Sequence, residues 1–257
     1  MLQVNSLTDK RIFENKIDLL VSDLDYTLIN FGLGHQAGVK NISKVLGQNV
    51  ANEFNDIFNL IHEKHIVIDK ENWDKQSRFS KIISQMKSLK FVKNQYGLKE
   101  YSREFYFIIA LKKFNLEPKK QTIEAARDAY WSGIKDSSPI YNDTKTFLSK
   151  LGKTPIIIMT GSDSVMTIAD DLSLEYVPEL SKAYKESRVK KVPFQYQGLI
   201  IGDPWDKPDE RFFNLVEMEI KRLGGFNKQN ILFLGDSYHA DLEVPERRGY
   251  KTVLIKR

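Results

Sequence analysis

Apolar residues along this chain follow two different patterns, which divide it into an α/β part and a helical part. Short continuous apolar runs, rich in β-branched residues, are typical of strands that are buried on both faces of a parallel sheet. Such runs predict strands at 17–21, 154–160, 198–202, 231–235 and 251–255. Helices are predicted between these strands, at 144–151, from near Asp163, and at 209–223. Asn142 or Asp143 is expected to cap the helix at 144–151.

Between residues 36 and 133 the apolar positions recur three or four apart, which predicts amphipathic helices. Four such faces are Val39, Ile42, Val45 and Leu46; Phe54, Ile57, Phe58 and Ile61; Phe79, Ile82, Ile83, Met86 and Leu89; and Tyr106, Ile109, Ala110 and Phe114. A last helix follows Pro118 and ends near Gly133. Most aromatic residues of this region are expected in its core: Phe54, Phe58, Trp73, Phe79, Phe91, Tyr96, Tyr101, Tyr130 and Trp131.

Strands that alternate with helices predict an α/β fold with a doubly wound, Rossmann-like parallel sheet and an inserted all-helical cap domain. We expect the core domain to comprise 1–31 and 138–257 and the helical domain to comprise 32–137. Residues 1–16 are expected to be a polar lead-in to the first strand. The lysine-rich stretch 180–191 is expected to be a solvated helix or loop.

Composition narrows the function classes. With 41% hydrophobic and 28% charged residues in a chain of 257, the protein is expected to be globular. The net charge is only +5 and no arginine-rich run occurs, so no nucleic-acid partner is expected. The absence of cysteine excludes disulfides, thiolate metal sites and cysteine nucleophiles. No long apolar run occurs, so we expect no membrane partner and a soluble cytoplasmic protein. The oligomeric state is left open by the sequence, with a monomer and a homodimer as the alternatives.

Candidate chemistry begins at the end of the first strand, where Asp23, Asp25 and Thr27 stand two residues apart. On an extended chain this spacing places their side chains on one side. Two acids at one edge repel each other unless a cation or a proton compensates their charge. The alternative is a strand that ends in an ordinary polar turn.

Polar residues also stand at the ends of two later predicted strands: Thr160 ends the strand at 154–160, and Asp236 follows the strand at 231–235. The carboxyl ends of parallel strands meet at one edge of the sheet. Asp23, Asp236 and Asp241 then form a site of hard oxygen ligands, which suits Mg²⁺. Thr160 and the amides after it, at the expected helix start, suit phosphoryl oxygens, and Lys207 suits their negative charge. Asp23 can attack phosphorus to form an aspartyl-phosphate, and Asp25 can transfer protons.

These motifs resemble, in kind and order, those of the haloacid dehalogenase (HAD) superfamily, specifically its phosphatases with a helical cap inserted after the first motif. The motifs are Asp23-Leu-Asp-Tyr-Thr27, Thr160 at a strand end, Lys207 in Lys-Pro-Asp, and Gly235-Asp-Ser with Asp241. The resemblance covers most of the chain. Each motif alone is unspecific, whereas the ordered set, with three members directly after apolar runs, is specific.

The resemblance implies a role for each matching residue. Asp23 would be the nucleophile and Asp25 the general acid/base, with its backbone carbonyl offered to Mg²⁺. Asp23 would also belong to the Mg²⁺ site, Asp236 would bind the ion directly, and Asp241 would bind it directly or through water. Phosphate-binding residues would be Thr160, Gly161 and Lys207. The family's dehalogenases lack an acid at the position of Asp25, so this residue favours phosphoryl transfer.

The sequence therefore predicts a Mg²⁺-dependent phosphatase that hydrolyses a small phosphorylated metabolite. A phosphotransferase or phosphomutase on the same core remains an alternative, because it differs only in the acceptor. A non-catalytic binding protein with this fold is a further alternative, against which the intact motifs argue. Four other lysines compete with Lys207 for the phosphate-binding role but are not expected to fill it: Lys182, Lys185, Lys190 and Lys191.

Overall fold

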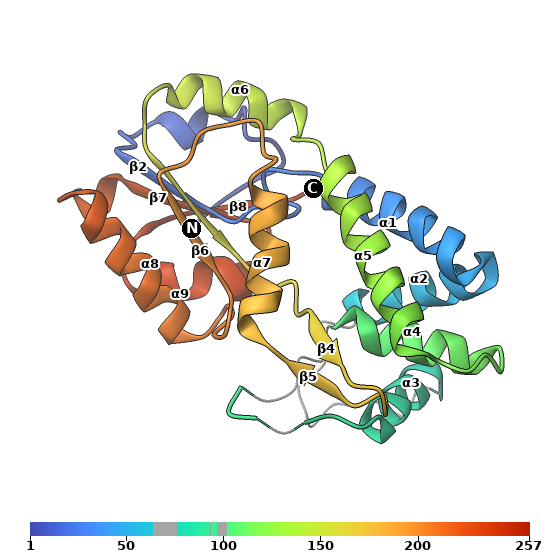
Figure 1. The fold of residues 1–257 in the computed structure, drawn as a ribbon. Helices are drawn as coiled ribbons and strands as arrows, with labels where there is room; N and C mark the ends of the chain where they lie inside the picture. Colours follow the sequence, from blue (N-terminus) through green and yellow to red (C-terminus); the bar gives the residue numbers. More distant parts are fainter. Residues whose placement is uncertain (64–76, 93, 97–101) are drawn as a thin grey trace. The chain divides into compact units, whose positions relative to one another are not determined.

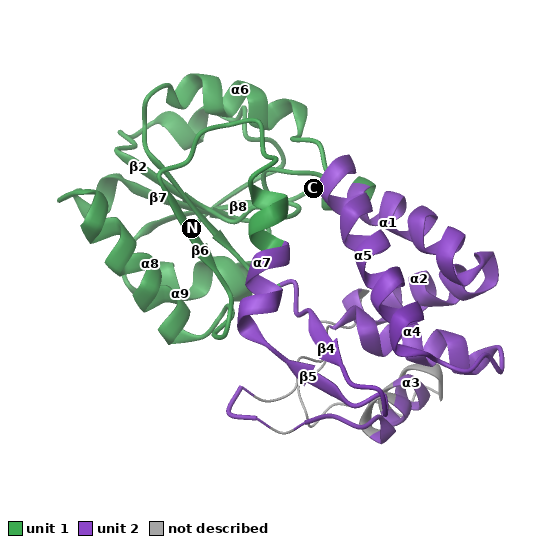
Figure 2. Cartoon of the chain, in the orientation of Figure 1, with its two compact units in different colours: residues 1–33, 138–162, 185–257 green, residues 34–137, 163–184 purple. Residues whose placement is uncertain are grey.

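The computed structural model describes residues 1–63, 77–92, 94–96 and 102–257, which form two compact units (Figure 2). Unit 1 comprises Met1–Leu33, Ser138–Ser162 and Lys185–Arg257, and unit 2 comprises Gly34–Ser137 and Asp163–Tyr184. The expected domain boundaries, 1–31 with 138–257 and 32–137, stay predictions. The segment Asp163–Tyr184, which we expected in the α/β core, clusters with unit 2.

Unit 1 is built on a six-stranded sheet whose neighbouring strands all pair in parallel, in the order β1-β8-β7-β2-β3-β6. The strands are β1 (Leu2–Val4), β2 (Leu19–Ser22), β3 (Ile156–Thr160), β6 (Gly198–Ile201), β7 (Ile231–Gly235) and β8 (Lys251–Ile255). The predicted parallel α/β sheet is confirmed. The lead-in is not merely polar, because β1 pairs with β8 at the edge of the sheet.

Helices cover both faces of this sheet (Figure 1). Alternate residues of a strand point to opposite faces, so Leu20 of β2 packs on the side of α6 (Asn142–Leu151), while Leu19 and Val21 pack on the side of α8 (Glu210–Leu223). The short helix α9 (Glu243–Arg247) lies on the α8 side. This is the doubly wound arrangement that the sequence predicts. Short helical turns lie at η1 (Lys10–Phe13), η2 (Lys228–Asn230) and η3 (Tyr238–Leu242).

Unit 2 contains the helices predicted from apolar spacing. They are α1 (Phe31–Leu46), which begins in unit 1, α2 (Gln48–Glu63), α3 (Ser77–Ser88), α4 (Arg103–Lys113) and α5 (Lys120–Ser137). Of the expected core aromatics, four are buried: Phe54, Phe58, Tyr130 and Trp131. Phe91 is half-buried and Tyr96 is exposed. Trp73, Tyr101 and the side chains of Phe79, Ile83 and Met86 lie outside the described part of the chain.

The helix expected from near Asp163 is wrong. Residues there form an antiparallel hairpin of β4 (Met166–Ile168) and β5 (Leu174–Tyr176), and helix α7 (Pro178–Val189) begins only afterwards. Ser164 and Leu172 have φ values of 53° and 63°, which a right-handed helix does not contain.

Among the described residues, no helix is both long and apolar enough to cross a membrane.

Candidate active site

The site lies where the strand order of unit 1 reverses, at the carboxyl ends of β2 and β7. These strands are neighbours, and the backbone N–H of Asp23 extends their pairing by donating to the carbonyl of Leu234 (2.9 Å). Asp23 directly follows β2 and Asp236 directly follows β7. The sheet topology alone therefore brings two residues 213 positions apart in the sequence to one edge, the usual ligand-binding position in such sheets.

Three carboxylates form a compact cluster at this edge. Asp23, Asp236 and Asp241 each offer an oxygen, and these atoms lie within 4.8 Å of one another. Asp241 is held in η3 by the backbone N–H of Ser237, which donates to its Oδ2 (3.0 Å). Thr27 donates its hydroxyl to Asp236 Oδ1 (3.0 Å). The geometry thus brings Asp23 of the first motif together with both acids of the fourth motif.

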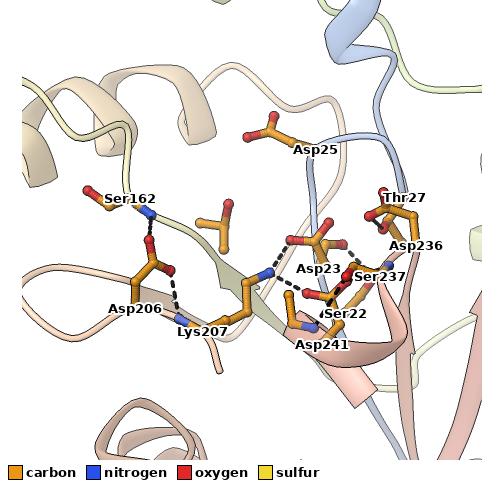
Figure 3. A network of polar contacts seen from close by, with 12 residues as sticks. Ser22, Asp23, Asp25, Thr27, Ser162, Asp206, Lys207, Asp236, Ser237 and Asp241 are labelled. Carbon is orange, nitrogen blue, oxygen red and sulfur yellow. Dashed lines mark hydrogen bonds and ion pairs between the residues drawn. The ribbon is translucent and has the colours of Figure 1, made fainter. Parts of the chain in front are cut away.

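Lys207 lies against this cluster. Its Nζ donates to Asp23 Oδ1 (2.6 Å) and to Asp241 Oδ1 (2.5 Å), as Figure 3 shows, and its side chain is only 7% exposed. Burial opposes its charge, but the two carboxylates outweigh burial and raise the pKa of Lys207. The lysine of the third motif therefore stays charged beside the nucleophile candidate.

One ammonium does not balance three carboxylates. Burial raises the pKa of Asp23 to about 8; Lys207 opposes that rise, and the charges of Asp241 and Asp236 add to it. Burial and the charge of Asp241 likewise raise the pKa of Asp236, to about 6. A largely buried, oxygen-only donor set with excess negative charge is what a hard divalent cation such as Mg²⁺ prefers, so these residues fit the ion that the resemblance implies.

Asp25 occupies a different environment. The strand ends at Ser22, and Tyr26 turns the chain with a φ of 61°, so Asp25 does not continue the extended spacing that we expected. In Figure 3 its carboxylate points away from Asp23, Asp236 and Asp241.

Two cations from α7 hold the Asp25 carboxylate. Arg188 donates to both of its oxygens (3.0 and 2.8 Å), and Lys185 Nζ donates to Oδ2 (2.9 Å). Burial would raise the pKa of Asp25, but the two cations outweigh burial and lower it well below its usual range. Asp25 is therefore an ionised carboxylate, which can accept a proton and must gain one before it can donate.

Asp206 joins the loop after β3 to the loop that carries Lys207. Its oxygens accept the backbone N–H groups of Ser162 (2.9 Å) and Lys207 (2.8 Å) (Figure 3). A side chain at Gly161 would approach this carboxylate, since an added Cβ would lie 3.2 Å from Asp206 Oδ1. The helix expected to start after Thr160 is absent. The amide of Ser162 donates to Asp206, and phosphate binding at Gly161 stays a prediction.

Comparisons with known proteins identify the fold. No protein-family model matches the sequence, and no curated protein matches it. Among solved structures, the putative HAD-hydrolase YfnB from Bacillus subtilis is 14% identical with a TM-score of 0.58, covering 93% of this chain and 87% of its own. A haloacid dehalogenase-like hydrolase from Xanthomonas campestris is 11% identical with a TM-score of 0.52, covering 93% and 82%. The L-2-haloacid dehalogenase from Xanthobacter autotrophicus is 13% identical with a TM-score of 0.51, covering 94% and 78%.

The chain has the haloacid dehalogenase-like fold. At these identities the likeness concerns the fold and not the reaction, because one fold hosts many chemistries. The similar structures include a dehalogenase and a putative hydrolase described as bound to magnesium.

Sequence reasoning did not expect Lys185 and Arg188 at this HAD-like site: Lys185 is considered only as a rival of Lys207 that is not expected to bind phosphate, and Arg188 is not considered. Both are buried, at 2% and 5% exposure, so the expectation of a solvated segment at 180–191 is wrong at these positions. Their spacing of three places them on one helix face, but Lys182 and Lys185 have the same spacing, so the sequence held no signal that separates the buried pair. Lys182, on the same helix, and Lys190, directly after it, are both exposed.

Proposed function

We propose that this protein is a Mg²⁺-dependent phosphomonoester hydrolase that acts on a small phosphorylated metabolite through an aspartyl-phosphate on Asp23. One observation carries the proposal. Asp23 lies in a largely buried cluster with Asp236, Asp241 and Lys207, and a second acid, Asp25, follows two positions later in the sequence. The magnesium bound to the similarly folded YfnB adds support.

The acidic cluster is the proposed metal site. The carboxylates of Asp23, Asp236 and Asp241 would hold the ion together with the backbone carbonyl of Asp25. When bound, Mg²⁺ supplies positive charge that offsets repulsion between the Asp23 carboxylate and an anionic phosphoryl group.

In the first step an oxygen of Asp23 attacks phosphorus and the bond from phosphorus to the leaving oxygen breaks. Asp25, once protonated, gives its proton to that oxygen. Lys207, Thr160 and Gly161 bind the transferring group, and the charge of Lys207 stabilises it. In the second step a water attacks the phosphorus of the aspartyl-phosphate and gives a proton to Asp25. The bond between phosphorus and the Asp23 oxygen breaks, so phosphate leaves, Asp23 is again a carboxylate and Asp25 is again protonated for the next cycle.

Asp25 favours this reaction over dehalogenation. A halide leaves as a stable anion and needs no proton donor, whereas the alkoxide of a phosphate ester does. By the resemblance, the family's dehalogenases lack an acid at this position. A phosphotransferase would use the same first step and differ only in replacing water by another acceptor.

The first test is release of inorganic phosphate from a panel of phosphorylated metabolites, with Mg²⁺ or with EDTA, and release of halide from L-2-haloacids in parallel. We expect phosphate release that depends on Mg²⁺ and falls at least about 10³-fold in Asp23→Asn, since asparagine has the same shape but is not a nucleophile here. The control is Asp170→Asn, whose side chain is 91% exposed.

Three outcomes would contradict the proposal: halide release without phosphate release, unchanged turnover in Asp23→Asn, or turnover that is indifferent to EDTA.

A further inference from the structure

Lys185 lies between two residues of the proposed site, Asp25 and Thr160. Its Nζ is 2.9 Å from Asp25 Oδ2 and 3.3 Å from Thr160 Oγ1, and its side chain is 2% exposed. Thr160 ends β3 and is the hydroxyl expected to bind a phosphoryl oxygen. Any anion that binds to this hydroxyl therefore lies within reach of a second lysine besides Lys207.

Asp25 does not need Lys185 to remain paired. The guanidinium of Arg188 contacts both carboxylate oxygens, and this two-point geometry holds a carboxylate in position by itself. A lysine side chain, by contrast, is a point charge on a flexible stem. Lys185 can thus move its ammonium to a neighbouring anion without leaving a buried carboxylate uncompensated.

Charge at the site favours such a movement. Lys207 already forms ion pairs with Asp23 and Asp241, and these two carboxylates offset its positive charge. A phosphoryl group adds up to two further negative charges beside Thr160. The ammonium of Lys185 lies at that hydroxyl, and charge-assisted hydrogen bonds to phosphoryl oxygens are among the stronger ones.

On the basis of the proposed function, we propose that Lys185 is a second phosphate-binding residue. Its ammonium leaves Asp25 and donates to an oxygen of the phosphoryl group that Thr160 binds, while Arg188 keeps Asp25 in place.

The test measures binding of inorganic phosphate, the expected product, by titration calorimetry with Mg²⁺ present, together with KM and kcat on the best substrate of the panel. We expect Lys185→Gln to weaken phosphate binding about 10- to 100-fold, the usual effect of losing a charged hydrogen bond. Lys185→Arg, which keeps the charge, should recover part of that affinity. The matched control is Lys182→Gln, an exposed lysine of the same helix, which should bind phosphate as the wild type does.

Circular dichroism establishes that each variant folds. If Lys185→Gln does not fold, Lys185→Met replaces it, because methionine keeps much of the length of the lysine stem. Phosphate affinity and KM equal to those of the wild type in a folded Lys185 variant would overturn this inference and leave the proposed function standing. A wild type that neither releases nor binds phosphate would overturn both.

Discussion

The Asp143 carboxylate joins three parts of unit 1 that are far apart in the sequence. It accepts the backbone N–H of Leu7 (2.9 Å) and both of its oxygens lie 2.8 Å from Nη1 of Arg257. The expected capping of α6 by Asn142 or Asp143 is wrong, because Tyr141 is the N-cap and makes no side-chain cap hydrogen bond. Asp143 contributes through tertiary contacts instead.

Stability should depend on pH through this residue. Burial would raise the pKa of Asp143, but the Leu7 amide and Arg257 outweigh it and lower the pKa below 3.8. A carboxylate with a lowered pKa stabilises the fold above its unfolded pKa, and this contribution is lost as pH falls through the folded value. Asp143→Asn should reduce the free energy of unfolding by about 1 kcal/mol at pH 7.

Urea unfolding of the wild type and Asp143→Asn measures this at pH 7 and at steps down to pH 3. The difference between the two should shrink as pH falls below 4. A difference that is constant over this range would show that charge is not responsible. Asp170→Asn, at an exposed position, should be neutral throughout.

At the scale of elements, helices α1 and α5 of unit 2 approach each other at two glycines. A Cβ added at Gly133 would lie 2.5 Å from the backbone nitrogen of Gly38 and 2.6 Å from its Cα. Contacts under 3.0 Å with backbone atoms cannot be relieved by rotating a side chain. The crossing therefore requires the absence of a side chain at Gly133.

Gly133→Ala should destabilise the protein by about 1–3 kcal/mol, because the added methyl group forces the two helices apart. The matched control is Gly225→Ala, since a Cβ at Gly225 meets no atom within 4 Å. The control should leave stability unchanged or raise it slightly. Equal urea midpoints for the two variants would contradict a close crossing of α1 and α5.

At the scale of the whole molecule, the proposed metal site belongs to unit 1 alone, since Asp23, Asp236 and Asp241 all lie in its segments. A ligand that binds only the folded state stabilises it by mass action. Mg²⁺ at ten times its dissociation constant should therefore raise the free energy of unfolding by about 1.4 kcal/mol.

The measurement is thermal unfolding in MgCl₂, in EDTA, and in NaCl of matched ionic strength. We expect MgCl₂ alone to raise the midpoint, and Asp236→Asn to lose most of that rise. Where two transitions are resolved, the transition of unit 1 should shift and that of unit 2 should not. An equal rise in NaCl would indicate charge screening in place of a metal site.

Local sequence patterns were enough to predict most of the strands and helices of this protein. Continuous apolar runs predicted five of the six strands of the sheet, and three-to-four spacing predicted the helices of unit 2, because each pattern follows from the geometry of its own element. The proximity of Asp23 and Asp236 followed as well, because residues that end neighbouring parallel strands meet at one edge of the sheet. Lys207 follows no strand directly, and it was mainly the resemblance that pointed to it.

Tertiary structure alone decided which partner each charged side chain has. Nothing in the local sequence distinguishes Lys185, which is buried against Asp25, from Lys182, which is exposed on the same helix. The same holds for Asp143, whose partners lie 136 and 114 positions away. The edge strand β1 and the hairpin of β4 and β5 are too short for a periodic signal. Ion pairs and short strands depend on what the rest of the chain places beside them, and a sequence pattern does not contain that information.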